Sequence, residues 1–165
     1  MPSSYSFDVV SQFDQQELVN AIDQLRREVD QRYDLKDSKT KIDILENQLS
    51  IVSLSDMTIQ AVKDILLQKA TKRNLSLKIF DFQKIETTGG NMVMQNVLLK
   101  KGLSQEIAKK LSKLVRDNIK KITVSIQGDS LRITGKNKDD LQSAINLIKS
   151  QEDELEIALQ FENYR

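Results

Sequence analysis

The stretch Ile85-Glu86-Thr87-Thr88-Gly89-Gly90-Asn91-Met92 decides how the two halves of this 165-residue chain are joined. Its glycine pair lies between two predicted strands, Leu75–Glu86 and Met92–Lys100, and leaves only a few residues in which the chain can turn. A loop this short joins antiparallel neighbours and cannot hold the long crossover that parallel strands need. We therefore predict that Met92–Lys100 pairs antiparallel with Leu75–Glu86.

Hydrophobic spacing on the two sides of the loop predicts the same order of elements twice. The first set is the strand Phe7–Phe13, a helix with its N-cap at Asp14, the strands Lys41–Glu46 and Leu49–Leu54, the helix Asp56–Arg73 and the strand Leu75–Glu86. The second is the strand Met92–Lys100, a helix capped by Ser104, the strands Ile122–Gln127 and Leu131–Thr134, a helix capped by Asn137 and the strand Leu155–Phe161. A repeated β-α-β-β-α-β order predicts an α+β protein with two ferredoxin-like domains, each an antiparallel four-stranded sheet with both helices on one face.

The short loop also predicts an exchange of strands between the domains. The last strand of a ferredoxin-like sheet lies beside the first, so Met92–Lys100 takes the place expected for the leading strand of its sheet. Ser6–Val10 is then left to pair with Leu155–Phe161 in the other sheet. We predict one domain over residues 12–101 and a second, basic domain over residues 1–11 and 102–165.

The composition excludes several classes of enzyme and site. The chain has no cysteine and no histidine, which removes disulfides, zinc sites with thiolate or imidazole ligands, and Cys-His or Ser-His-Asp nucleophiles. Neither glycine-rich phosphate-loop motif occurs, and no apolar run is long enough for a bilayer. We expect a cytosolic protein that is not an enzyme, does not contact a membrane and needs no cofactor or metal.

Positive charge is concentrated in one part of the chain. Between Val97 and Lys138, 11 of the 14 charged side chains are basic, whereas the whole chain has a formal net charge of +1. Clustered cations bind phosphates and release condensed counterions, so this segment predicts a nucleotide or nucleic-acid partner. A helix surface that only serves solubility is the alternative.

The candidate phosphate-binding residues follow from this segment. They are Lys100, Lys101, Lys109, Lys110, Lys113, Arg116, Lys120, Lys121, Arg132 and Lys136. If Ile122, Val124 and Ile126 face the helices, alternation places Lys121 and Thr123 on the open face of the sheet. Arg132 on the neighbouring strand is the candidate for a selective contact, because its planar guanidinium can bind phosphate or guanine in two-pronged fashion.

Two further groups carry side chains that can stack on bases. Phe80 and Phe82 alternate in a predicted strand, so they either stack bases on an open face or pack between the domains. Arg26, Arg27 and Arg32 with Tyr33 end the first helix, where they either contact guanine and phosphate or form ordinary helix-surface ion pairs. The strands that would carry the aromatic residues of an RNA-recognition motif contain none.

Several segments in their order along the chain resemble the YajQ family of small bacterial nucleotide-binding proteins, from end to end. These segments include Ser6-Phe7-Asp8-Val9-Val10-Ser11, Arg27-Glu28-Val29-Asp30-Gln31-Arg32-Tyr33-Asp34, Lys100-Lys101-Gly102-Leu103, Ile126-Gln127-Gly128-Asp129 and Leu159-Gln160-Phe161-Glu162-Asn163-Tyr164-Arg165. The resemblance implies tandem ferredoxin-like domains with swapped N-terminal strands, and binding of nucleotides or nucleic acid, with some members described as receptors for cyclic di-GMP. Leu35 and Ala158 depart from the family pattern, which has an aromatic and a proline there.

The main functional hypothesis is a non-enzymatic protein that binds a nucleotide or RNA on the basic open-sheet surface. The resemblance adds a guanine nucleotide or cyclic di-GMP as the possible ligand, and a regulatory protein as a possible partner. The alternative is a protein–protein adaptor whose basic patch meets an acidic partner. The sequence leaves the oligomeric state open.

Overall fold

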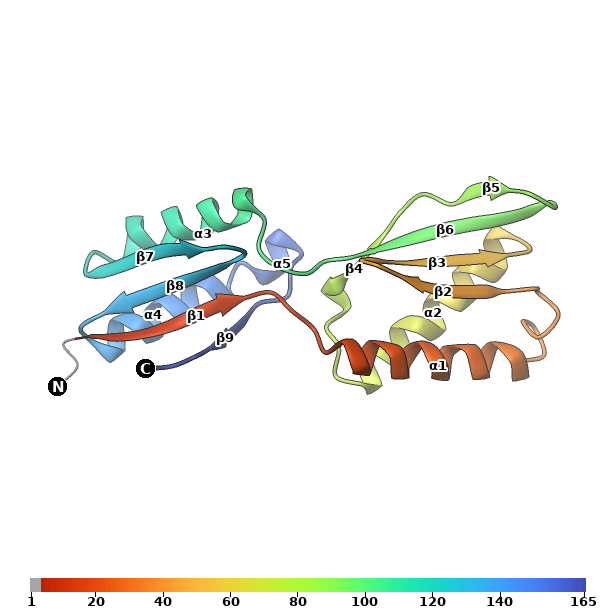
Figure 1. The fold of residues 1–165 in the computed structure, drawn as a ribbon, viewed down its shortest axis with the longest axis horizontal. Coiled ribbons are helices and arrows are strands. Elements are labelled where there is room, and N and C mark those ends of the chain that lie inside the picture. The colour runs from red at the N-terminus through yellow and green to blue at the C-terminus, as the bar shows by residue number, and fades with distance from the viewer. Residues whose placement is uncertain (1–3) are drawn as a thin grey trace. The chain divides into compact units, whose positions relative to one another are not determined.

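The computed structural model describes residues 4–165, which form two compact units (Figure 1). The N-terminal unit is Phe13–Lys100, and the C-terminal unit is Lys101–Arg165 together with the chain up to Gln12. No helix in the part of the chain that the structure describes is long and apolar enough to cross a membrane. Each unit has its own sheet and its own pair of long helices, as in tandem ferredoxin-like domains.

The N-terminal unit is a sheet with both of its long helices packed on one face (Figure 1). Its helices and strands are α1 (Gln15–Gln31), β2 (Lys41–Leu45), β3 (Gln48–Ser53), α2 (Asp56–Lys72), the 3-10 turn η1 (Leu77–Ile79), β4 (Phe80–Phe82), β5 (Glu86–Thr88) and β6 (Met92–Leu99). The strand order is β2-β3-β6-β4, and β5 pairs with β6. Asp14 caps α1 by accepting hydrogen bonds from the backbone of Gln16 and Glu17, as predicted.

The glycine loop closes the hairpin that the sequence predicts. Thr88 lies opposite Met92, and the loop turns through Gly90 at φ +72° and Asn91 at φ +60°. Glycine and asparagine accept these positive angles more easily than other residues do. The predicted antiparallel pairing of Met92–Lys100 with the strand before the loop is therefore confirmed, over β4 and β5.

The prediction of one continuous strand over Leu75–Glu86 is wrong. Ser76 caps the 3-10 turn η1 by accepting a hydrogen bond from the backbone of Lys78. Between β4 and β5 the pairing with β6 then slips by one residue, from Phe82 opposite Val97 to Glu86 opposite Met94. The extra residue makes a β-bulge, which the buried side chain of Gln95 fills by donating a hydrogen bond to the carbonyl of Gln83 at 2.8 Å.

The C-terminal unit contains the strand from the start of the chain. Its elements are β1 (Tyr5–Val10), α3 (Gln105–Asn118), β7 (Ile122–Gln127), β8 (Ser130–Gly135), α4 (Lys138–Lys149), α5 (Glu152–Leu155) and β9 (Gln160–Glu162). The strand order is β7-β8-β1-β9, all pairs antiparallel. Val10 lies opposite Gln160, which confirms that the N-terminal strand pairs with the C-terminal one.

The strand β1 lies inside this sheet, because it also pairs with β8 from Tyr5 opposite Gly135 to Val9 opposite Leu131. The predicted strand Leu155–Phe161 is shortened to β9. Leu155 instead ends the helix α5, and Glu156 follows at φ +52°, in a turn that the backbone hydrogen bond from Ile157 to Glu152 closes at 3.2 Å.

The core of the C-terminal unit lies between the sheet and the helices α3 and α4. Phe7 and Val9 of β1 are 1% and 0% exposed in it. They pack with side chains from the other elements, including Leu131, Ile133, Ala108, Leu111, Ala144 and Ile148. Because alternate residues of a strand point to opposite faces, Asp8 of β1 and Arg132 and Thr134 of β8 lie on the face away from the helices.

Candidate phosphate-binding pocket

A pocket forms in the C-terminal unit where β7 begins, β8 ends, α3 ends and α4 begins. Ile122 lies opposite Gly135, so Lys121 and Lys136 flank the same end of the β7–β8 hairpin. A Cβ atom on Gly135 would approach Ile122 and Leu141 to 3.4 Å, so glycine lets α4 start close to the sheet. The antiparallel register therefore brings two lysines from different strands to the first turn of α4.

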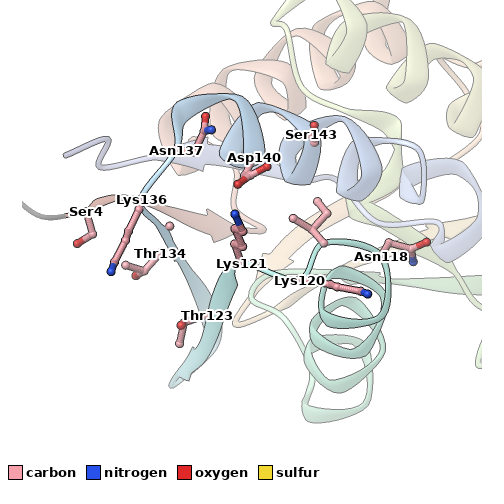
Figure 2. A pocket seen from close by; sticks show the side chains of 12 residues that line it. Ser4, Asn118, Lys120, Lys121, Thr123, Thr134, Lys136, Asn137, Asp140 and Ser143 are labelled. Atoms are coloured by element: carbon pink, nitrogen blue, oxygen red, sulfur yellow. The ribbon is translucent and has the colours of Figure 1, made fainter.

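The resulting phosphate pocket has a volume of about 1120 Å³ (Figure 2). Three of the predicted cations line it, Lys120, Lys121 and Lys136, and all three are exposed. Its other polar lining residues are Ser4, Asn118, Thr123, Thr134, Asn137, Asp140 and Ser143. Asp140 is the single acid in this lining, so the pocket carries a formal excess of two positive charges.

The first turn of α4 offers backbone N–H groups at the pocket, although its side chains Asp139 and Asp140 are acidic and oppose the binding of an anion. Asn137 caps the helix by accepting a hydrogen bond from the backbone of Asp139 at 2.8 Å. A helix start presents backbone N–H groups and the positive end of the helix dipole, and both favour anions. Thr123 and Thr134 add two hydroxyl donors to the lining of the pocket. In chemical terms, this arrangement suits a phosphate group.

The remaining cations of α3 lie on its exposed surface. Lys109, Lys113 and Arg116 are exposed and follow one another at helical spacing toward Lys120 at the phosphate pocket. Arg116 donates from Nε to the carbonyl of Ser112 at 3.3 Å, within its own helix. Lys110 lies off this row and forms an exposed ion pair with Glu106 at 3.6 Å.

Three other candidates lie outside the phosphate pocket. Lys100 and Lys101 are at the boundary between the units, and neither lines the pocket. Arg132 lies on the open face of the sheet, where its Nε donates to the carboxylate of Asp8 at 3.0 Å. Arg132 would therefore have to keep or exchange this partner if it contacted a ligand.

The Asp8 carboxylate is held by two donors. Besides Arg132, the side-chain amide of Asn163 donates to it at 2.9 Å. The Arg132 hydrogen bond is the largest cause that lowers the pKa of Asp8, and burial opposes it. Because the pKa of Asp8 is lower in the folded state than its unfolded value of about 3.9, the ionised carboxylate stabilises the fold at pH values above about 3.9. This stabilisation is lost as the pH falls through the pKa of the folded state.

An Asp8→Asn variant should therefore be less stable than the parent near neutral pH, and the difference should shrink as the pH falls below about 4. Urea unfolding at several pH values measures this. The exposed Asp117 of α3 provides the control variant Asp117→Asn, which should change the urea midpoint little at any pH. A difference for Asp8→Asn that stays constant from pH 7 to pH 2 would contradict this role of the carboxylate.

The arginines of α1 form ion pairs and a backbone contact in the structure. Arg26 donates from Nε to the carbonyl of Ile42 at 3.2 Å and pairs with Asp23 at 3.3 Å. Arg32, which follows α1, binds both carboxylate oxygens of Asp34, at 2.9 and 2.8 Å. These contacts are of the kind that the helix-surface alternative predicts.

Arg27, Arg32 and Tyr33 are exposed, and two of them, Arg27 and Tyr33, form none of the ion pairs above. The ring of Tyr33 is 90% exposed, with Nζ of Lys36 5.5 Å from its centroid. A guanine contact at the end of α1 stays a prediction for these two residues.

The structure places Phe80 and Phe82 on the helix side of their sheet and not on the open face that the base-stacking alternative requires. Phe80 is 6% exposed, and Phe82 lies opposite the fully buried Val97. The two rings are 6.0 Å apart, and Nζ of Lys63 on α2 lies 4.4 Å from the centroid of the Phe82 ring. They face the helices because β4 starts directly after the 3-10 turn η1, so strand alternation does not extend back to Lys78 or past the bulge to Lys84.

Sequence reasoning missed how the start of α4 completes the pocket. Asn137 was recognisable as an N-cap and Lys136 as a cation, and their adjacency was the available signal. Asn118 and Ser143 carried no such signal, since they reach the pocket only through the packing of α3 and α4. Within residues 4–165, no three acidic side chains gather in a way that could hold a metal ion.

Taken together, two ferredoxin-like sheets with an exchanged leading strand define a tandem ferredoxin-like protein, and its C-terminal unit carries a basic pocket. The family model described as "Nucleotide-binding protein YajQ-like" matches residues 5–165. The chain therefore belongs to the YajQ-like family, as its sequence segments indicate.

Curated relatives are similar to the chain over its full length and over theirs. A protein named as nucleotide-binding from Prochlorococcus marinus strain NATL1A is 89% identical over 165 residues, which cover all of both chains. Proteins with the same description from Synechococcus strains CC9605 and JA-3-3Ab are 70% and 56% identical, again over all of both chains. The chain is thus similar from end to end to proteins whose names describe nucleotide binding.

Proposed function

We propose that this protein binds nucleotides, and the phosphates of RNA, in the phosphate pocket of the C-terminal unit. One observation carries the proposal: Lys120 and Lys121, between α3 and β7, and Lys136, between β8 and α4, line one pocket beside the start of α4. The names of its relatives support a nucleotide as the ligand class. Guanine nucleotides, cyclic di-GMP among them, are the first ligands to test.

Longer nucleic acids extend from the pocket along α3. Lys109, Lys113 and Arg116 are separated by four and three residues, so they follow one face of α3. At 1.5 Å per residue, the row spans roughly 10 Å, and Lys120 lies just past the end of the helix. A mononucleotide thus depends on the pocket alone, whereas RNA depends on the pocket and the row. The protein then acts without catalysing a reaction. Binding of the nucleotide or RNA changes how the protein contacts another macromolecule in the cytosol.

Two variants with equal loss of charge separate these contributions. The pocket variant replaces Lys120, Lys121 and Lys136 with glutamine, and the helix variant replaces Lys109, Lys113 and Arg116 with glutamine. We expect the pocket variant to bind GTP and cyclic di-GMP at least about tenfold more weakly, and the helix variant to bind them about as well as the parent. Both should weaken binding of single-stranded RNA irrespective of its sequence, and the helix variant should reduce the slope of log affinity against log salt by about 2.

Isothermal titration measures all of these affinities, and circular dichroism checks the fold. Folding should be preserved because the substituted side chains are exposed and such changes usually cost within about 0.5 kcal/mol. A folded pocket variant with unchanged affinity for both GTP and RNA would overturn the proposal. It would favour the adaptor hypothesis, in which the basic surface meets an acidic protein.

A further inference from the structure

A smaller pocket lies in the C-terminal unit, where the start of β1 meets α4 and the last residues of the chain. Its volume is about 210 Å³. The aromatic pocket, as we call it, is lined mainly by Tyr5, Phe7, Leu141, Ile145 and Tyr164, with Lys138 beside them. Nothing in the proposed phosphate contacts uses these side chains.

One ring of this pocket, that of Phe7, is buried, whereas the rings of Tyr5 and Tyr164 are accessible to solvent. Phe7 is 1% exposed, and the centroid of its ring lies 6.0 Å from that of Tyr164, with 33° between the ring planes. Tyr164 is 64% exposed, although its ring packs beside the core. Tyr5 is partly buried, and Nζ of Lys138 lies 5.0 Å from its centroid. A base could therefore contact both tyrosines and a cation above an apolar floor.

No residue lines both the aromatic pocket and the phosphate pocket, but neighbouring residues of two segments line one or the other. Ser4 lines the phosphate pocket, and its neighbour Tyr5 lines the aromatic one. The first turn of α4 is divided in the same way, with Asn137 on the phosphate side and Lys138 on the aromatic side. The two pockets are thus next to each other along two separate segments of the chain.

From this juxtaposition we infer that the aromatic pocket holds the base of a nucleotide whose phosphates lie in the phosphate pocket. The inference rests on the proposed function. A volume of about 210 Å³ is below the roughly 300–1,000 Å³ of pockets for drug-sized ligands, so it suits one ring system and not a whole nucleotide. Stacking on tyrosine accepts any base, because every base has a π-face, so this subsite adds affinity with little selectivity.

Ring-removing and ring-retaining substitutions test the inference. Tyr5→Leu and Tyr164→Leu should each weaken GTP binding roughly 5- to 150-fold, the range expected for loss of stacking on one base. Tyr5→Phe and Tyr164→Phe keep the ring and should stay within about twofold of the parent. Inorganic tripolyphosphate, which has no base, should bind all four variants as it binds the parent. Tyr164 is largely exposed, so its variants remain informative if Tyr5→Leu fails to fold.

A second readout uses the tyrosine rings directly. The chain has three tyrosines, so their ring signals in NMR spectra can be assigned by single substitutions. GTP should shift the signals of Tyr5 and Tyr164 and leave that of Tyr33 in place. Equal affinity of the parent for tripolyphosphate and GTP, or normal GTP binding by both leucine variants, would overturn the inference and leave phosphate binding intact. A shift at Tyr33 alone would place the nucleotide in the N-terminal unit and overturn both the inference and the proposed function. Failure of the parent to bind both GTP and tripolyphosphate would overturn the proposed function itself.

Discussion

Removing residues 1–11 is expected to unfold the C-terminal unit and to leave the N-terminal unit folded. The deletion takes away β1, which lies between β8 and β9 and forms backbone hydrogen bonds with both. It also removes Phe7 and Val9 from the core. Strands β8 and β9 then have no common neighbour, and the core between the sheet and helices α3 and α4 opens to water. None of the deleted residues belongs to the N-terminal unit.

Hydrogen exchange measured by mass spectrometry tests this expectation peptide by peptide. Amides of β8, α3 and α4 should lose their protection, whereas those of β3 and α2 should keep it. Retained protection in β8 and α4 would contradict the exchange of the leading strand. Loss of protection throughout the chain would contradict the independence of the two units.

The second large effect is expected from a single core substitution in the same strand. Phe7→Ala should lower the free energy of unfolding of the C-terminal unit by about 3–5 kcal/mol, because it removes a fully buried ring and leaves a cavity. A loss of this size is a large part of the roughly 5–15 kcal/mol that stabilises a typical domain. Urea unfolding, followed by probes in the C-terminal unit, measures it.

The neighbouring position provides a matched control. Ser6 is partly buried and points to the other face of β1, and its backbone exchanges hydrogen bonds with Arg165 at 3.2 and 3.0 Å. Ser6→Ala keeps both of these backbone bonds, so its effect should stay within about 0.5 kcal/mol. Equal losses for Phe7→Ala and Ser6→Ala would show that β1 does not contribute its alternate side chains to this core.

The connection between the two sheets could be predicted from the sequence because one physical constraint dominates it. The loop at Gly89 and Gly90 is too short for a crossover, and this alone fixes the pairing of Met92–Lys100. From that pairing, the N-terminal strand is the one left for the second sheet. The repeated helix caps and hydrophobic spacing supply the remaining elements. The structure confirms them except for the strands at Leu75–Glu86 and Leu155–Phe161 and the end of the strand Phe7–Phe13, since β1 stops at Val10.

The bulge between β4 and β5 could not be predicted, because a slip of one residue depends on the partner strand. Gln95 stabilises it from β6, twelve residues away from Gln83. This slip and the preceding 3-10 turn change which side chains face the helices, so Phe80 and Phe82 lie against α2 and not on an open surface. Alternation within a single strand carries no information about such a change.

The sequence predicts a basic candidate site in the C-terminal half of the chain, but it does not predict which side chains form the pocket. Clustering of positive charge predicts a phosphate-bearing partner, but it does not say which of the ten cations lie together. The structure gathers three of them, Lys120, Lys121 and Lys136, because β7 and β8 pair with Ile122 opposite Gly135. Arg132 has the same charge but an ion pair with Asp8, which belongs to a strand 124 residues earlier. Contacts between segments so far apart in the sequence follow from topology.

Mapping the bound phosphate on the protein tests the central claim most directly. Backbone amide signals of the labelled protein are followed by NMR during titration with GTP and, separately, with tripolyphosphate. The account predicts that both ligands shift the amides of Lys120, Lys121, Lys136 and Asn137, and that α1 is unaffected. Shifts confined to the end of α1, around Arg27 and Tyr33, would contradict it and would place the nucleotide in the N-terminal unit.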